Sequence, residues 1–104
     1  MKFIETQDEW SALMEESKSK LVVVDFTASW CGPCQMIAPV FEKMASENPD
    51  ITFVKVDVDD AEDIAAACGI SAMPTFQFYK GGTRVDEFRG ANTSQLEALV
   101  AKHK

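Results

Sequence analysis

Two cysteines, Cys31 and Cys34, stand two residues apart at a point where the sequence changes character. An apolar run over residues 21–26 precedes them, and a long amphipathic pattern follows them. The first thiol therefore falls at the predicted N-terminus of a helix, where free backbone N–H groups and the helix dipole favour an anion. A stabilised thiolate beside a second thiol is suited to disulfide exchange, so these residues predict a dithiol–disulfide oxidoreductase.

The spacing also predicts a role for each thiol. Residues i and i+3 share a face of a helix, so the two sulfurs can meet in one bond. We expect Cys31, at the terminus, to be the exposed nucleophile, and Cys34, one turn further in, to be the more buried resolving thiol. Gly32 and Pro33 preset the turn between them, and the missing N–H of Pro33 costs nothing in a first helical turn.

Two other interpretations of the cysteine pair are a zinc site and plain packing. A structural zinc needs four ligands. The only other cysteine and the only histidine, Cys68 and His103, each stand alone and far away in the sequence. The sequence therefore favours a redox pair and predicts no metal site.

Asp25 interrupts the apolar run that leads to the cysteines. A carboxyl group among Val22, Val24 and Phe26 is costly to ionise, so desolvation should raise its pKa. We expect it to accept the proton of Cys34, directly or through a water molecule. The alternative is an aspartate at a strand end that faces solvent.

Met73, Pro74 and Thr75 open another predicted strand. Proline at this position donates no ladder hydrogen bond, and an X-Pro bond can be cis. If the segment lies against the cysteines, the free backbone of Met73 can pair with an extended substrate. Taken alone, the sequence favours a structural turn.

Two further side chains are candidates on weaker grounds. We expect Trp30 to be exposed beside Cys31 as part of a docking surface, the alternative being a core aromatic. We expect Cys68, which precedes Gly69 at a helix end, to be a small buried residue, the alternative being a regulatory thiol.

The rest of the chain predicts the elements that position these residues. Strands and helices alternate until a final hairpin at Gly81 and Gly82, which implies parallel pairing with crossovers followed by one antiparallel pair. We expect an α/β fold in one domain over residues 1–104, with a central mixed sheet flanked by helices on both faces. Thr6 with Glu9, Asp59 with Asp60, and Asn92 should cap helices. The apolar faces should include Met36, Ile37, Val40, Phe41 and Met44 in the helix after the cysteines.

The totals exclude several classes of protein. A net charge of −7 disfavours nucleic acid and anionic lipid as partners, although the charge also serves solubility alone. No apolar run is long enough to span a membrane, and the N-terminus lacks the apolar stretch of a signal peptide. Three cysteines without a secretory signal favour a redox role over a disulfide scaffold, and we expect a cytoplasmic protein.

The motif Trp30-Cys31-Gly32-Pro33-Cys34 resembles the active site of the thioredoxin family, in its cytosolic animal type. The resemblance runs nearly end to end. It also includes Val23-Val24-Asp25-Phe26, Pro39, Lys55-Val56-Asp57, Met73-Pro74-Thr75, Gly81 and Gly90-Ala91.

This resemblance implies a thioredoxin fold, with Pro74 cis and packed against the cysteine pair. Asp25 would be the buried acid, with Lys55 near it, and the substrate groove would be lined by Trp30, Ala72, Met73, Gly90 and Ala91. The resemblance further implies a general electron carrier and protein-disulfide reductant without a bound cofactor, which serves cell redox homeostasis. Electrons would come from NADPH through thioredoxin reductase, and the acceptors would be peroxiredoxins, methionine sulfoxide reductases and ribonucleotide reductase.

The sequence departs from the animal type at Ala61 and Ala72, where relatives often carry cysteines. We therefore expect neither a second disulfide with Cys68 nor a covalent dimer, but a monomer that can pair weakly through apolar residues around Trp30. Two alternatives remain open: a noncatalytic binding subunit of the same fold, and a disulfide oxidant or isomerase of the secretory pathway.

Overall fold

In a computed structural model, which describes residues 1–104, five strands form one mixed sheet in the order β1-β3-β2-β4-β5. β1, β3 and β2 run parallel, while β4 and β5 run antiparallel to their neighbours. The elements follow one another as β1 (Lys2–Phe3), α1 (Gln7–Glu16), β2 (Val22–Thr27), α2 (Gly32–Glu47), β3 (Thr52–Asp57), α3 (Glu62–Ala67), β4 (Thr75–Lys80), β5 (Thr83–Arg89) and α4 (Thr93–His103). The predicted order of strands and helices is confirmed.

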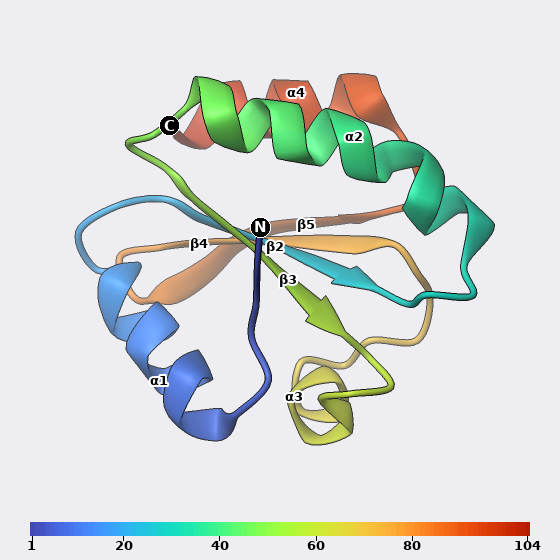
Figure 1. The fold of residues 1–104 in the computed structure, drawn as a ribbon. Helices are drawn as coiled ribbons and strands as arrows, with labels where there is room; N and C mark the ends of the chain where they lie inside the picture. Colours follow the sequence, from blue (N-terminus) through green and yellow to red (C-terminus); the bar gives the residue numbers. More distant parts are fainter.

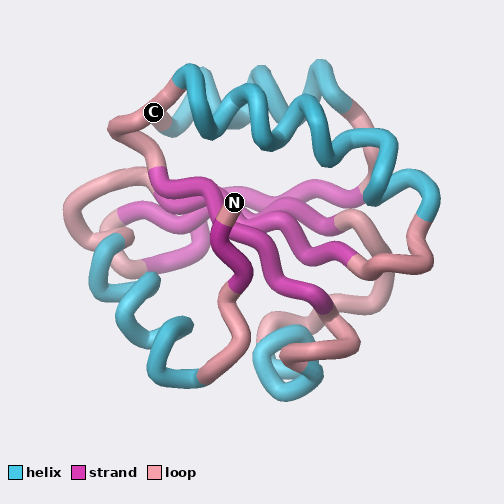
Figure 2. Tube along the Cα trace, viewed as in Figure 1, coloured by secondary structure: helices cyan, strands magenta, loops and turns pink.

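Helices cover both faces of the sheet, as Figure 1 shows, with α2 and α4 on one face and α1 and α3 on the other. The tube in Figure 2 shows the strands as a single twisted layer between them. Every residue of β2 is buried, which is the expected state of a central strand whose two faces both carry helices. The expected α/β architecture, a central mixed sheet with helices on both faces, is therefore confirmed.

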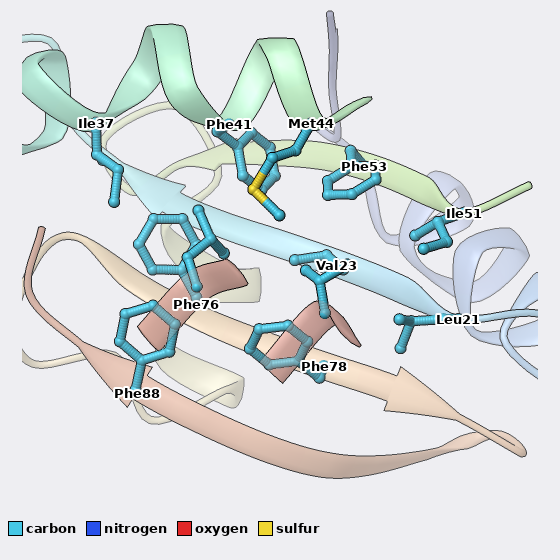
Figure 3. Close-up of a cluster of buried hydrophobic side chains, with 12 residues drawn as sticks. Leu21, Val23, Ile37, Phe41, Met44, Ile51, Phe53, Phe76, Phe78 and Phe88 are labelled. Atoms are coloured by element: carbon cyan, nitrogen blue, oxygen red, sulfur yellow. The ribbon is translucent and has the colours of Figure 1, made fainter. Parts of the chain in front are cut away.

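Each face of β2 contributes to a separate hydrophobic core. The larger core joins α2, α4 and the sheet, and Ile37, Phe41 and Met44 point from α2 toward Val23 and Phe76 (Figure 3). The smaller core packs α1 and α3 against the opposite face. Asp25 alternates with Val24 along β2 and is therefore on the α2 side.

One apolar assignment in α2 was wrong. Met36 is 76% exposed, whereas Cys34, Ile37, Phe41 and Met44 are buried. The buried residues recur at intervals of three and four, and Met36 falls one position outside that stripe. An apolar side chain that lies next to the buried face of a helix can therefore still be exposed to solvent.

The helix starts agree with the sequence in two places and differ in one. Thr6 and Glu9 form the predicted capping box of α1, and Asn92 caps α4 through the Gln95 N–H. α3 has Ala61 at its N-cap and no side-chain cap, so the cap predicted at Asp59 and Asp60 was wrong. Both of their N–H groups instead donate to Asp57 Oδ1, because the chain turns before the helix begins.

The predicted hairpin between β4 and β5 is confirmed. Gly81 and Gly82 have φ angles of +68° and +81°. Residues with a Cβ rarely adopt this conformation, so two glycines suit a tight connection of this kind.

Candidate functional site

The cysteine pair lies where β2 gives way to α2. Cys31 is the N-cap residue of α2, and the Cys34 N–H points at Cys31 Sγ at 3.3 Å. The two cysteines form a disulfide, with their Cα atoms 5.3 Å apart. One turn of helix therefore holds both sulfurs in bonding range, and its N-terminal N–H group is placed to stabilise a thiolate on Cys31 when the bond opens.

The two sulfurs differ less in exposure than the sequence suggested. Cys31 is 6% exposed and Cys34 is 1% exposed, so the expected order holds but Cys31 is also buried. In the disulfide state Cys31 turns toward Cys34 and packs with Ala28, while Val58 and Met73 lie against the pair. Cys31 is therefore the more accessible of the two residues to an incoming nucleophile.

A second segment forms a wall beside the disulfide. The Met73–Pro74 bond is cis, as the resemblance implied. Thr75 Oγ1 donates to the Ala72 carbonyl at 2.6 Å, and the Gly90 N–H donates to the Pro74 carbonyl at 2.9 Å. These bonds bring residues 72–75 and Gly90, which are distant in the sequence, to the same edge of the site.

Trp30 is exposed beside the cysteines, and its indole N–H donates to Asp59 Oδ2 at 2.8 Å. This bond fixes the ring over the segment between β3 and α3. Sequence reasoning missed this role of Asp59, because Asp59 stands 29 positions away and matched a helix cap.

Asp25 is fully buried in β2, on the face of the sheet that α2 covers, so the solvent-facing alternative is excluded. Neither carboxyl oxygen has a hydrogen-bond partner within the protein. Burial raises the pKa of Asp25 to about 7, which the positive charge of Lys55 opposes and the negative charge of Glu42 reinforces. A carboxyl group with a pKa near neutrality can both release and accept a proton under ordinary conditions.

Lys55 is the register partner of Asp25 on the neighbouring strand β3 and is 7% exposed. The resemblance placed it near Asp25, and the backbones do adjoin. Its ammonium nevertheless pairs with Glu42, at 2.9 Å between Nζ and Oε2. Glu42 was missed by sequence reasoning, because nothing in the pattern of α2 distinguishes it from the other carboxylates of that helix.

Cys68 is not brought to this site. It lies half-buried against the core on the α1 and α3 face, with its sulfur 3.9 Å from the Tyr79 hydroxyl. Burial raises the pKa of the Cys68 thiol. A raised pKa lowers the thiolate fraction, so the structure favours the small buried residue over a reactive thiol.

No group of three or more His, Cys, Asp and Glu side chains is arranged to hold a metal ion. None of the helices has the length and apolar character that crossing a membrane requires.

Comparisons with known proteins agree with this geometry. The family model described as Thioredoxin matches residues 2–102. The thioredoxin of Ictalurus punctatus is 50% identical over 103 residues, covering 97% of this chain and 96% of that protein. Among solved structures, Fasciola hepatica thioredoxin superposes with a TM-score of 0.96, at 47% identity and full coverage of both chains.

A further structural relative comes from a structure described as the structural basis of the thiol resolving mechanism in yeast mitochondrial 1-Cys peroxiredoxin via glutathione/thioredoxin systems. The TM-score is 0.91 at 36% identity, covering 98% of this chain and 94% of that chain.

Proposed function

Because this chain belongs to the thioredoxin family, a family of protein-disulfide oxidoreductases, we propose that it acts as a general reductant of protein disulfides. The chain is a thiol–disulfide oxidoreductase, and Cys31 and Cys34 are its redox pair. The family generally needs no bound cofactor. The observation that carries thiol–disulfide exchange is the placement of Cys31 at the N-cap of α2, where an N–H group points at its sulfur and favours a nucleophilic thiolate. The reducing direction rests on family membership.

The reaction is two successive thiol–disulfide exchanges. In the first, the Cys31 thiolate attacks a substrate disulfide, a mixed disulfide forms, and one substrate thiolate leaves. In the second, the Cys34 thiolate attacks Cys31 Sγ, the Cys31–Cys34 bond forms, and the second substrate thiolate leaves. Two electrons pass to the substrate, whose thiolates take up two protons, and the protein ends in the disulfide state.

Asp25 supplies the acceptor for the Cys34 proton in the second exchange. Its burial on the α2 side of β2, the lack of a hydrogen bond to its oxygens from within the protein and a pKa of about 7 support this role. Lys55, Gly32, Pro33 and Pro74 support the reaction by shaping the turn and the surroundings of the pair. Cys68 takes no part in the exchange reaction. A regulatory modification of Cys68 would leave the cysteine pair unchanged.

The substrate lies in the groove between Trp30 and the wall of residues 72–75 and 90–91. Trp30 presents an exposed ring, and the backbone of Met73 offers an extended substrate hydrogen bonds, while Ala72, Gly90 and Ala91 line the substrate site. Aromatic and backbone contacts of this kind bind many sequences, which suits a general reductant.

The partners follow from family membership. Thioredoxin reductase, with electrons from NADPH, returns the pair to dithiols. Peroxiredoxins, methionine sulfoxide reductases and ribonucleotide reductase receive the electrons, and the peroxiredoxin named with the yeast relative supports the first of these. We assign the protein to the cytoplasm, as one domain over residues 1–104 that is mostly monomeric and can pair weakly around Trp30.

Two measurements on one set of proteins test this function. Cys34→Ser should trap a covalent adduct with a disulfide-bonded protein through Cys31, and Cys31→Ser should trap none. A redox titration of the native pair should give about −270 mV, the value for thioredoxin itself, against about −120 mV for a strong oxidant.

The results distinguish the alternatives. A potential near the oxidant value would make the protein a disulfide donor. Failure to trap any adduct, together with partner binding that survives the double Cys→Ser change, would make it a noncatalytic binding subunit.

A further inference from the structure

Asp25 and Lys55 are neighbours in the sheet, but they form no ion pair, and a third residue binds Lys55. Asp25 and Lys55 are paired in register on β2 and β3, and their side chains share the face that α2 covers. A carboxylate and an ammonium side by side in a buried layer attract strongly. No ion pair joins them, and both Asp25 oxygens remain without a partner.

The Lys55 ammonium is held elsewhere. Its Nζ lies 2.9 Å from Glu42 Oε2 and 5.8 Å from the centroid of the Phe3 ring. Glu42 is on α2 two turns after Cys34, and its side chain is 51% exposed. The side chain of Lys55 thus reaches toward α2 and the edge strand β1, where its charge is paired.

Few other ionisable side chains face the same side of the sheet as Asp25. Two of them, Cys34 and Glu42, belong to α2. The other two, Lys55 and the half-buried Asp57, belong to β3. The side chains that β4 and α4 contribute to this core, including Phe76 and Leu96, do not titrate. Lys55 is the only cation among them.

We propose that Glu42 is a positioning residue that binds Lys55 and keeps its ammonium away from Asp25, so that Asp25 stays a competent acceptor for the Cys34 proton at neutral pH. An ammonium in contact with Asp25 would hold it ionised but make it a weaker base. Glu42 touches neither substrate nor sulfur. Its own negative charge adds a direct effect on Asp25, and the larger effect runs through the placement of Lys55. This inference rests on the role proposed above for Asp25.

The test compares Glu42→Ala with Glu47→Ala. Glu47 is a matched control, because it is an exposed carboxylate on the same helix and its ion-pair partner is Lys43. The Asp25 carboxyl is titrated by ¹³C NMR in the oxidised protein, where neither active-site thiol titrates. We expect Glu42→Ala to lower the Asp25 midpoint by about one pH unit or more, and Glu47→Ala to leave it in place.

A double-mutant cycle with Lys55→Met separates positioning from a direct field. If Glu42 acts through Lys55, Glu42→Ala should shift the midpoint much less in the Lys55→Met background. An equal shift in both backgrounds would show that Glu42 acts directly on Asp25 and would overturn the proposal. An unchanged midpoint in the single variant would overturn it as well.

The same proteins separate this inference from the proposed function. Glu42→Ala should also move the acid limb of the pH–rate profile for the second exchange to lower pH, in step with the NMR midpoint. Native protein and Glu47→Ala that reduce no protein disulfide would refute the proposed function, while the NMR midpoints would still decide whether Glu42 positions Lys55.

Discussion

The carboxyl group of Asp25 is fully buried, and no group of the protein donates a hydrogen bond to it. Such a group costs free energy to keep, and a buried amide or aliphatic side chain would cost less. Its place in β2, the strand that leads to the cysteine pair, gives this cost a function in the proposed reaction, because an acid whose pKa is about 7 can take a proton from Cys34 near neutral pH.

Asp25→Asn should therefore slow the second exchange. In the native protein the rate should rise with pH through about 7, as Asp25 loses its proton and becomes an acceptor. The amide accepts no proton, so at neutral pH the variant should be slower by about a hundredfold, the lower end for general acid–base catalysis. Rapid quenching followed by mass analysis gives the decay rate of the mixed disulfide.

Asp8→Asn is the control, because Asp8 is an exposed carboxylate in the first turn of α1. It should behave as the native protein does. Equal decay rates in Asp25→Asn and native protein across the pH range would remove Asp25 from the reaction.

For single residues, the sequence predicted the properties that depend on neighbours along the chain. Asp25 stands among valines and Phe26, so its burial and raised pKa could be predicted. The pairing of Lys55 with Glu42 could not, because it joins a strand to a helix 13 positions away and depends on how the helix lies across the sheet. The bond from Trp30 to Asp59 is hidden from the sequence for the same reason.

The helices begin in different ways, and local chemistry decides which of them could be predicted. In α1, Thr6 and Glu9 exchange side-chain hydrogen bonds with each other's backbone. This motif lies within four residues, so it can be recognised without the fold. α3 is only six residues long and begins at Ala61 without any side-chain cap, so its start is set by packing of Ile64 and Ala65 instead.

Thr6→Ala should destabilise the protein through α1. The change leaves the Glu9 N–H without its acceptor, the Thr6 hydroxyl at 3.1 Å. The free energy of unfolding should fall by about 1 kcal/mol, as for other N-cap threonines. Urea denaturation measures it, with the slope unchanged.

Ser11→Ala makes the same change in type at an exposed position inside α1 and should be neutral or slightly stabilising. A loss in Ser11→Ala as large as in Thr6→Ala would show that the cap contributes nothing specific.

At the scale of the whole molecule, the sheet separates two apolar cores, and the ionisable site lies at the edge of one of them. The layers could be predicted, because β2 is apolar on both faces and the helices alternate with strands. The substrate wall could not be built from sequence alone, because it needs the bond from Gly90 to Pro74 across the sheet edge. Only the resemblance placed those residues together.

The buried acid should make the stability of the whole fold depend on pH. The pKa of Asp25 is about 7 in the folded protein and 3.8 for an ordinary carboxyl. Because the folded state binds this proton more tightly, its contribution to stability is complete below pH 3.8 and is lost as the pH rises through 7. The full loss corresponds to about 4 kcal/mol.

Asp25→Asn should abolish this dependence. Between pH 5 and pH 8 the free energy of unfolding of the oxidised native protein should fall by about 2–3 kcal/mol more than that of the variant. Unfolding by guanidinium at each pH measures the difference.

Parallel curves for the two proteins would mean that Asp25 keeps an ordinary pKa in the fold, and its proposed part in proton transfer would lose its physical basis. Diverging curves would mean that the fold gives up stability at neutral pH to hold a proton acceptor for Cys34. Glu42→Ala should then reduce the divergence, because an ammonium released toward Asp25 stabilises the ionised carboxyl in the folded state.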